Sequence, residues 1–483
     1  MSEQKQSLDK PRGSYVNGRW AVTDTVVDVI NPATGKPFAQ VSEVSLSQVQ
    51  EALGGAHRAL PAWRALTAKA RGSFLHRIAD ELAQRRDEIA RTITLENGKP
   101  LAQSRGEVAM AEDHLHWFAE EGRRAHGRIM PHQTDSKRNL VVRTPIGVVG
   151  AISPWNFPLV LAVRKVAPAL AAGCPVVLKP SAQTPLCAIA LAECVQAAEL
   201  PSGVFHLVIG NARIISAEFL RNPVCRKITF TGSTRVGREL VAGAAQSLKP
   251  LSLELGGLAP VLVFEDCDLD VAVRETLVAK FRNTGQSCVA ANRIYVQRSI
   301  HDKFVARFVE GTKKLKTCSG LEPGADIGPL ISREAVQAAL SQIEDTLSRG
   351  GNLLCGGKPL AGADGFFLEP TVIDDASHDA VCMQQETFAP IAPIACFDSE
   401  AEAVELANRS EYGLSAYAMT RDVTRIFRLA EQIEAGTLGI NDGAPTSSQC
   451  PFGGVKQSGW GRELGSEGLD AFLETKHVSL GGF

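Results

Sequence analysis

A chain of 483 residues exceeds the roughly 250–300 residues that one hydrophobic core usually supports, so at least two domains are expected. Its 51 basic and 53 acidic residues give a formal charge of −2, and the basic residues are scattered, so no nucleic-acid partner is expected. The eleven cysteines form no Cys-x-x-Cys pair and have no histidine cluster nearby, so neither a disulfide framework nor a metal site is expected.

The first ten residues are polar and contain no apolar signal core. The longest apolar stretch, residues 148–178, is interrupted by Arg164 and Lys165, which argues against a membrane span. We therefore expect a cytoplasmic protein with no membrane partner, acting on a small molecule.

From residue 148 onward, short β-branched runs alternate with helical patterns. The runs predict strands at residues 148–153, 176–179, 204–210, 227–231 and 251–255. Helices are predicted between them, at residues 159–172, 185–198, 214–221 and 235–245. Strands about 25 residues apart with intervening helices are typical of βαβ units, so a parallel, Rossmann-like sheet covered on both faces is expected.

A second alternation predicts another α/β domain nearer the C-terminus. Its candidate strands are residues 352–355, 391–397, 414–420 and 437–441. Its candidate helices are residues 333–349, 401–407 and 423–433. Residues 129–144 and 465–481 fit neither alternation.

Two residues suggest covalent chemistry. Cys288 ends the segment Phe281-Arg-Asn-Thr-Gly-Gln-Ser-Cys288, and Glu254 lies 34 residues upstream in Glu254-Leu-Gly-Gly257. A thiol and a carboxylate can divide the oxidation of an aldehyde between them. The thiol makes the carbonyl carbon tetrahedral so that it can release hydride, and the carboxylate activates the water that hydrolyses the resulting thioester.

Seven short motifs extend this observation over most of the chain. They are Pro154-Trp-Asn-Phe-Pro158, Lys179-Pro-Ser181, Phe230-Thr-Gly-Ser-Thr234, Glu254-Leu-Gly-Gly257, Gly285-Gln-Ser-Cys288, Glu386-Thr-Phe388 and Pro451-Phe-Gly-Gly454. In this order and spacing they resemble the aldehyde dehydrogenase superfamily, and within it the NAD(P)-dependent succinate-semialdehyde dehydrogenases.

The resemblance implies an α/β fold with three parts. Residues 1–128 and 145–256 would form a Rossmann-like NAD(P)-binding domain, and residues 257–446 an α/β catalytic domain. Residues 129–144 and 447–483 would form a β-arm for oligomerisation. A homodimer or homotetramer is therefore expected from the resemblance.

The usual dinucleotide fingerprint Gly-x-Gly-x-x-Gly is replaced by Gly232-Ser-Thr-Arg-Val-Gly237. This segment follows a predicted strand and opens a helix, where free N–H groups and the helix dipole favour a phosphate. An ordinary turn with a Ser or Thr N-cap is the structural alternative. The resemblance assigns contact with the pyrophosphate to Ser233.

Lys179 ends a predicted strand, where α/β folds place ligand groups. A solvated lysine is the alternative reading. The resemblance implies that Lys179 contacts the adenosine ribose. NAD-selective relatives carry a glutamate three positions later, where this chain has Ala182. Without that carboxylate, and with Lys179 and Ser181 able to contact a 2′-phosphate, the chain is expected to accept NADP as well as NAD.

The resemblance also places Glu386 at the nicotinamide ribose and Phe388 beside it, although a surface glutamate is the alternative for the first. Ala389 replaces the glycine usual after this Phe. Further cofactor contacts are implied for residues in the same motifs or at predicted strand ends: Ile152, Ser153, Pro154, Trp155, Gly210, Phe230, Gly232 and Gly257.

The resemblance implies three catalytic residues. Cys288 would be the nucleophile, and Asn156 would bind the thiohemiacetal oxyanion together with the nucleophile's own N–H, although Asn156 beside two prolines could also be a turn residue. Glu254 would activate water. Relatives that transfer the acyl group to coenzyme A generally lack this glutamate, so a free acid is the expected product. Lys165 and Glu463 match a second proton relay or form a plain ion pair.

The substrate is suggested by Arg164 and by Arg282, six residues before the thiol. Both match positions where succinate-semialdehyde dehydrogenases bind the distal carboxylate, and Ser447 matches a hydroxyl that assists them. Paired guanidinium groups suit a small oxyanion, although each could form a structural ion pair. The loop at residues 442–448 departs from the commonest form of the subfamily, which leaves substrate length open.

The sequence thus predicts oxidation of succinate semialdehyde or a similar anionic aldehyde to its acid. Another dehydrogenase acting on a sulfonated, longer or neutral aldehyde is one alternative. The other is a non-redox protein, either a cysteine hydrolase or a silent binding protein. No histidine stands in a recognisable motif near Cys288, and all three catalytic candidates are present, which disfavours both forms.

Overall fold

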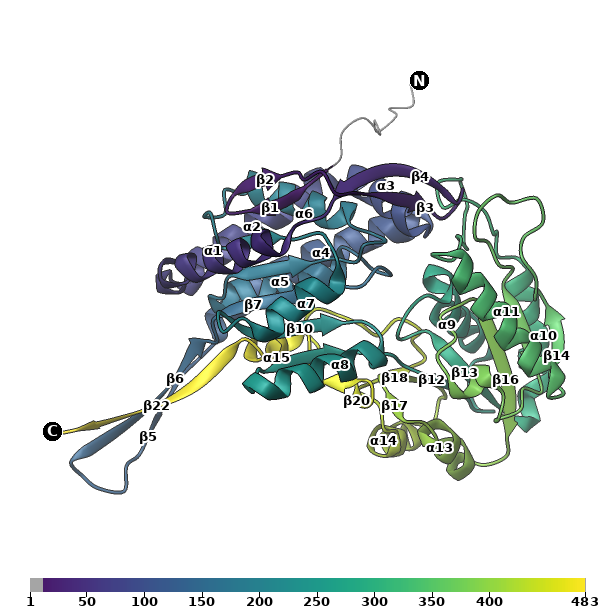
Figure 1. Cartoon of the computed structure of the whole chain (residues 1–483). Helices are drawn as coiled ribbons and strands as arrows, with labels where there is room; N and C mark the ends of the chain where they lie inside the picture. Colours follow the sequence, from purple (N-terminus) through teal and green to yellow (C-terminus); the bar gives the residue numbers. More distant parts are fainter. Residues whose placement is uncertain (1–11, 483) are drawn as a thin grey trace.

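The computed structural model describes residues 12–482, which form two α/β bodies side by side and one projecting arm (Figure 1). The first body is built on an eight-stranded sheet in the order β2-β1-β9-β8-β7-β10-β11-β21. Its central strands are parallel: β7 (Val148–Ile152), β8 (Val176–Lys179), β9 (Phe205–Leu207), β10 (Cys225–Thr231) and β11 (Leu251–Glu254). The sequence predicts all five, and β9 is shorter than the predicted 204–210.

Three short antiparallel strands complete this sheet. They are β1 (Ser14–Val16) and β2 (Arg19–Ala21) at one edge and β21 (Gly459–Trp460) at the other. Beside the sheet lies the separate hairpin of β3 (Val26–Asn31) and β4 (Lys36–Ser42).

The strand order creates the place for a ligand. β8 and β9 follow β7 on one side, whereas β10 and β11 continue on the other, so the chain reverses direction across the sheet between β7 and β10. Loops that leave two such strands diverge and open a crevice at their carboxyl ends. These loops begin at Ser153 and Gly232, inside two of the recognised motifs.

Helices surround the first sheet. They are α1 (Leu46–Ala65), α2 (Ala68–Gln84), α3 (Arg86–Asn97), α4 (Leu101–Glu121), η1 (Gly122–Arg124), α5 (Val160–Ala172), α6 (Leu186–Ala197), α7 (Ala212–Arg221), α8 (Thr234–Ala244) and η2 (Ala245–Ser247). All 13 residues of α5 are buried, Arg164 and Lys165 included. Two cations are thus held in an apolar helix, where their desolvation must be offset.

The second body has a seven-stranded sheet. In spatial order its strands are β14 (Asn352–Cys355), β15 (Thr371–Asp374), β16 (Ile391–Phe397), β13 (Ala291–Gln297), β12 (Ala259–Val263), β18 (Ser415–Met419) and β19 (Thr437–Ile440). Only the β14–β15 pair is antiparallel. Its helical segments are α9 (Leu269–Phe281), η3 (Arg282–Gly285), η4 (Arg298–Ile300), α10 (His301–Lys313), α11 (Arg333–Ser348), α12 (Val381–Gln384), α13 (Glu400–Asn408) and α14 (Val423–Gln432).

Three strands of this sheet, β12, β13 and β15, are absent from the sequence prediction. Nearly all their residues are buried, so they lack the alternation of apolar and polar residues that marks a half-exposed strand. β15 is in addition only four residues long. Periodicity alone cannot separate such runs from a buried helix.

The arm is a three-stranded antiparallel sheet of β5 (Arg128–Met130), β6 (Lys137–Pro145) and β22 (Leu473–Gly481) (Figure 1). Within the C-terminal segment, the arm includes fewer residues than the predicted 447–483. Gly459–Trp460 return to the first sheet beside β11, and Gly465–Asp470 form helix α15. A small pair, β17 (Tyr412–Gly413) with β20 (Val455–Lys456), joins this segment to the second body.

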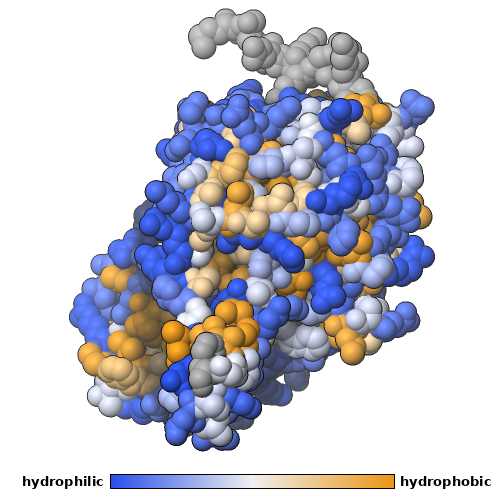
Figure 2. Space-filling view, turned by 90° about the vertical axis from the view of Figure 1, so that its left-hand side faces the viewer, coloured by the Kyte–Doolittle hydropathy of each residue, from blue (hydrophilic) through white to orange (hydrophobic). Residues whose placement is uncertain are grey.

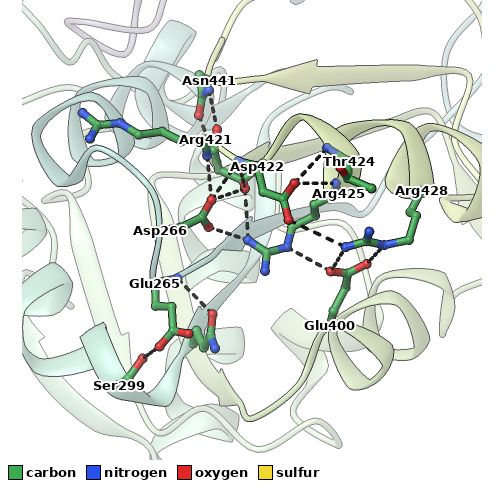
Figure 3. A network of polar contacts seen from close by, with 12 residues as sticks. Glu265, Asp266, Ser299, Glu400, Arg421, Asp422, Thr424, Arg425, Arg428 and Asn441 are labelled. Atoms are coloured by element: carbon green, nitrogen blue, oxygen red, sulfur yellow. Dashed lines mark hydrogen bonds and ion pairs between the residues drawn. The ribbon is translucent and has the colours of Figure 1, made fainter.

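A network of ion pairs fastens α13 and α14 to the second sheet (Figure 3). Asp266 accepts hydrogen bonds from the backbone of Arg421 and Asp422 at 2.8 and 2.9 Å and pairs with Arg425. Arg425 also pairs with Glu400, at 3.0 Å. Arg428 pairs with Glu400 and Arg421 with Asp268, so each guanidinium in this network faces a carboxylate, the usual arrangement for a structural arginine.

Within residues 12–482, no helix has both the length and the apolar character needed to cross a membrane.

Candidate active site

A cavity of about 200 Å³ opens between the two bodies of the chain. Residues from the β7–α5 loop, the β10–α8 turn, the segment after β11 and the segments before β13 and β16 line it: Pro154, Trp155, Asn156, Thr231, Gly232, Ser233, Leu255, Gly256, Cys288, Glu386 and Phe388. Eight of these are predicted site residues, which the fold brings together from four distant segments. We refer to it as the cofactor cavity, after the predicted role of those residues.

The β10–α8 turn has the features of both structures predicted from its sequence, a helix N-cap and an anion-binding turn. Ser233 is the N-cap of α8, and its Oγ accepts a hydrogen bond from the N–H of Val236 at 3.4 Å. Gly232 lies against the ring of Phe230, which an added Cβ would approach to 2.4 Å. Ser233 can cap α8 while the turn still binds an anion, because the cap uses only one N–H group of the first helical turn. The other N–H groups of that turn remain available at the end of α8 that borders the cavity.

The end of β8 carries the predicted ribose site. Lys179 is buried, and burial lowers the pKa of its amine to about 8. Ser181 is partly exposed and Ala182 is exposed, just beyond Lys179. The other predicted contacts, Ile152, Ser153 and Gly210, lie at or just after the ends of β7 and β9, along the same edge of the sheet.

Glu386 reaches this edge from the second body. Its Oε1 accepts a hydrogen bond from the N–H of Gly257 at 3.1 Å, and burial raises the pKa of the carboxyl to about 8. An added Cβ on Gly256 would stand 3.2 Å from the other Glu386 oxygen, so the small residue leaves that oxygen accessible. Phe388 packs edge-on against Trp155, with ring centroids 5.4 Å apart.

Cys288 lies on the wall of this cavity and is partly exposed. Burial, followed by the charges of Glu386 and Glu254, raises the pKa of the thiol to about 12, whereas Arg164 opposes that shift. A raised pKa disfavours the thiolate, the form that attacks a carbonyl, so the nucleophile needs a group that takes its proton.

The backbone before Cys288 makes an unusual turn. Asn283, Thr284 and Gly285 have φ values of 52°, 60° and 73°, the left-handed region that non-glycine residues avoid. An added Cβ on Gly285 would meet the carbonyl oxygen of Ala389 at 2.3 Å, so only glycine fits there. Such strain costs on the order of 1–3 kcal/mol per residue and persists where a functional geometry requires it.

Asn156 is 4% exposed, and its Nδ2 donates to the carbonyl oxygen of Gln286 at 3.2 Å. This bond uses one of the two N–H groups of the carboxamide and leaves the other for a ligand. The amide is thereby tied to the chain segment that presents Cys288. The backbone N–H of Cys288 has no acceptor among the described residues, so two donors are available near the thiol.

Glu254 ends β11 and is buried, and its Oε2 has no hydrogen-bond partner among the described residues. Burial and then repulsion by Glu463 raise the pKa of this carboxyl well above its usual range, against the attraction of Lys165 and Arg164. Lys165 donates to Glu463 at 2.5 Å and to Thr231 at 2.6 Å. The predicted relay pair is therefore in contact and is electrostatically linked to the predicted base.

Arg164 and Arg282 differ from the arginines of the network in Figure 3. Neither forms an ion pair with a carboxylate of the described chain, and Arg164 Nε has no hydrogen-bond partner. Arg164 lies over the ring of Phe452, 4.7 Å from its centroid, and Arg282 over the ring of Phe157 at 5.3 Å. Burial lowers the pKa of both guanidinium groups.

Arg282 borders two further cavities. One, of about 520 Å³, opens at the surface between α4 and α9 and includes Met110 on its wall. The other, of about 20 Å³, is lined by Ser287 and Val289, the two neighbours of Cys288. Cys288 therefore lies on the wall of the cofactor cavity, and its two chain neighbours line a second, small cavity that Arg282 borders.

Some residues of this site have no signal in the sequence. Tyr417 from β18 and Thr446 line the small cavity beside Arg282, whereas Ser447, the predicted hydroxyl, is not among its lining residues. Tyr417 donates its hydroxyl to the carbonyl oxygen of Val289 at 2.7 Å. Only the packing of β18 against β12 brings Tyr417 here, and no local pattern marks it. Among residues 12–482, no group of three or more His, Cys, Asp or Glu is arranged to hold a metal.

Comparison with known proteins agrees with this architecture. A sequence profile described as the aldehyde dehydrogenase family matches residues 20–478. The chain is 46% identical to a glutarate-semialdehyde dehydrogenase of Pseudomonas aeruginosa and 45% identical to the NADP+ succinate-semialdehyde dehydrogenase GabD of Escherichia coli, in each case over 97% of both chains. A crystal structure of succinate-semialdehyde dehydrogenase from Burkholderia pseudomallei matches with a TM-score of 0.97, at 44% identity over 100% of both chains. The chain therefore belongs to the aldehyde dehydrogenase family.

Proposed function

We propose that this protein oxidises a small semialdehyde with an anionic far end, succinate semialdehyde or a close analogue, to the corresponding acid with NAD(P)+. Relatives named for succinate semialdehyde and glutarate semialdehyde are about equally similar, so similarity alone does not choose between tail lengths. The proposal therefore specifies an aldehyde at one end and a carboxylate, or an oxyanion of similar size, at the other.

Arg164 and Arg282 carry this proposal. Both guanidinium groups are largely buried without a carboxylate partner, unlike Arg425, and without the backbone carbonyl acceptors that satisfy the buried Arg293. A buried cation without a counter-ion is costly, and a bidentate oxyanion would offset that cost. Arg164 also interacts electrostatically with Cys288, so an anion between the arginines would belong to a molecule close to the thiol.

The cofactor cavity fits a nicotinamide dinucleotide. Gly232 and Gly256 occupy places that a Cβ would fill, Ser153 Oγ is buried without a partner, and Glu386 presents an oxygen beside Gly256. Ser233 and the first turn of α8 would hold the pyrophosphate, Lys179 the adenosine ribose and Glu386 the nicotinamide ribose. When bound, the nicotinamide ring accepts the hydride that the substrate carbon releases.

The chain's own residues perform the remaining steps. Once deprotonated, Cys288 Sγ attacks the aldehyde carbon and forms a thiohemiacetal, whose oxyanion the amide of Asn156 and the N–H of Cys288 stabilise. Loss of hydride leaves a thioester on the sulfur. Glu254 then takes a proton from water, the hydroxide attacks the thioester carbon, and the C–S bond breaks to release the acid and regenerate the thiolate.

The raised pKa of Glu254 suits this last role. An ordinary glutamate is too weak a base for water, whereas a buried carboxylate near Glu463 holds a proton more strongly. Lys165 and Glu463 would pass that proton onward, because Lys165 bridges Glu463 and Thr231. Acceptance of NADP is expected from Ala182, because position 182 itself carries no carboxylate to repel a 2′-phosphate.

A substrate and coenzyme panel tests the proposal. NADH or NADPH formation is followed with succinate semialdehyde, glutarate semialdehyde, a sulfonated aldehyde and propanal, and the anionic aldehydes should give the higher kcat/KM. Arg164→Met and Arg282→Met should each lower kcat/KM for anionic aldehydes roughly 10- to 150-fold, the range of a charged hydrogen bond worth about 1.5–3 kcal/mol, and change propanal little.

Arg307→Met is the matched control, because Arg307 pairs with Asp270 at the surface and should leave every rate unchanged. If propanal outperforms every anionic aldehyde, the role given to the arginines is wrong. If no aldehyde produces NADH or NADPH, the redox reaction itself is wrong, and the alternative of a non-redox binding protein on this fold stands instead.

A further inference from the structure

A buried ion pair outside the proposed chemistry lies directly beneath the loop that carries Asn156. Lys99 follows the C-terminus of α3, Glu107 belongs to α4, and their Nζ and Oε2 atoms are 2.6 Å apart. Both side chains are 0% exposed. A fully buried pair of this kind is weak support for stability by itself, since apolar replacements of similar volume are often neutral or stabilising.

Each member of the pair also binds the backbone of the β7–α5 loop. Lys99 Nζ donates to the carbonyl oxygen of Asn156 at 2.7 Å and lies 3.9 Å from the ring centroid of Phe157. Glu107 Oε1 accepts from the N–H groups of Leu159 and Val160, at 2.9 and 3.2 Å. The pair thus binds the loop on both sides of Pro158.

The two sets of contacts fix two parts of the proposed site. The bond from Lys99 fixes the peptide of the residue whose carboxamide would bind the oxyanion. The bonds to Glu107 supply the N-terminal cap of α5, because the N-cap residue Leu159 offers no side-chain acceptor. Arg164 lies in the second turn of that helix, so its backbone position depends on the same cap.

We propose that Lys99 and Glu107 are a positioning pair, which holds the Asn156 carboxamide against the Gln286 carbonyl, in register with Cys288, and sets the start of α5. This inference rests on the proposed oxyanion role of Asn156. Neither residue touches the reacting atoms, and the pair acts through Asn156.

Other contacts should keep the loop folded when the pair is removed. Asn283 Nδ2 also donates to the Asn156 carbonyl oxygen, at 2.8 Å, and Asn97 Nδ2 donates to the Trp155 carbonyl oxygen at 3.1 Å. Loss of Lys99 Nζ should therefore shift the carboxamide rather than release the loop. Displacements of about 1 Å in a positioned group can cost up to about 100-fold in rate.

The test is a double-mutant cycle on the single-turnover rate of NAD(P)H formation with the best aldehyde of the panel. The four proteins are the wild type, the pair variant Lys99→Met/Glu107→Gln, Asn156→Ala, and their combination. The pair variant removes both charges together, and the glutamine can still accept from the α5 N–H groups. We expect it to slow the rate roughly 10- to 100-fold, and Asn156→Ala about 100- to 1,000-fold.

A positioning role predicts that the two effects are not additive. On the Asn156→Ala background the pair variant should cost less than about threefold, because the group it positions is gone. The alkylation rate of Cys288 by iodoacetamide, followed on its peptide by mass spectrometry, should be unchanged, since alkylation forms no oxyanion. Arg85→Met/Glu193→Gln, which removes a partly exposed ion pair far from the loop, is the control and should leave both rates unaltered.

The outcomes separate this inference from the proposed function. If Asn156→Ala costs nothing, the oxyanion role fails, and the positioning role fails with it. If Asn156→Ala slows the reaction, two results would show that only the positioning role is wrong. One is that the pair variant has its full effect on the Asn156→Ala background. The other is that the pair variant leaves the wild-type rate unchanged. If the methionine variant does not fold, Lys99→Gln/Glu107→Gln takes its place. This variant keeps two polar side chains, and the glutamine at position 99 is one bond shorter than lysine.

Discussion

At the scale of single residues, the site is marked by polar atoms whose hydrogen-bonding capacity is unused. Twelve buried side-chain nitrogen and oxygen atoms in the described residues have no partner, and those of Ser153, Arg164, Glu254 and Glu463 are among them. Such atoms are rare in folded proteins because each costs about 1–3 kcal/mol. Three of these residues, Arg164, Glu254 and Glu463, also interact electrostatically with Cys288, as expected of groups that await a ligand, water or a proton.

Glu463→Gln should move the acidic limb of the kcat profile to lower pH. Glu463 raises the pKa of Glu254 by repulsion, whereas Lys165 lowers it by attraction. Removing the charge of Glu463 therefore lowers the pKa of Glu254. A general base is active when deprotonated, so its limb follows its pKa downward. The measurement is kcat with saturating aldehyde and coenzyme across pH. Glu467→Gln, an exposed neighbour, should leave the limb in place, and an upward shift in Glu463→Gln would contradict the linkage.

At the scale of elements, the carboxyl ends of β7, β8 and β10 collect the predicted cofactor contacts. Ser153, Lys179 and Gly232 stand at or next to the last residues of these three parallel strands. They lie at one edge because parallel strands end on the same side of a sheet. Coenzyme choice should therefore depend on the short loop after β8, whose tip includes the exposed Ala182.

Ala182→Glu should shift the coenzyme preference toward NAD+. A carboxylate at position 182 would repel a 2′-phosphate by about 1–3 kcal/mol, which raises KM for NADP+ roughly 5- to 150-fold relative to NAD+. Gln183→Glu places the same charge one residue further along the exposed loop and is the matched control. Equal effects of the two substitutions on KM for both coenzymes would show that position 182 does not face the phosphate.

At the scale of the whole molecule, the arm is the part least explained by a single chain. β5, β6 and β22 project from the first body, and Figure 2 looks onto the side from which the arm extends. Ile129 is 80% exposed and Met130 44% exposed on its outer strand. Exposed apolar side chains on an unsupported sheet favour contact with another chain, consistent with the expected homodimer or homotetramer.

Ile129→Asp/Met130→Lys should therefore weaken self-association. Sedimentation of the wild type should give a mass of two or four times the 51.6 kDa chain, and the variant should move toward 51.6 kDa because charged side chains resist burial in an interface. Val423→Asp, at an exposed apolar position on α14, is the comparison variant. A wild type that sediments at 51.6 kDa would contradict the expectation of an oligomer.

The sequence by itself determined the βαβ order of the first body and the motifs that resemble the aldehyde dehydrogenase family. Both depend on local information: β-branched runs and turns fix strand and helix positions, and motif spacing fixes the relation between Glu254 and Cys288. Local patterns failed for β12 and β13, because strands buried on both faces lose their alternation.

Tertiary structure alone decided which side chains are buried without partners and which distant segments meet. No pattern around Lys99, Glu107 or Tyr417 relates them to Asn156, Leu159 or Val289, since those contacts join residues that are 57, 52 and 128 positions apart. Burial and partner choice are properties of the packed chain, because they depend on what the rest of the molecule places around each group. The contrast between the unpaired Arg164 and the paired Arg425 is therefore visible only in the folded molecule.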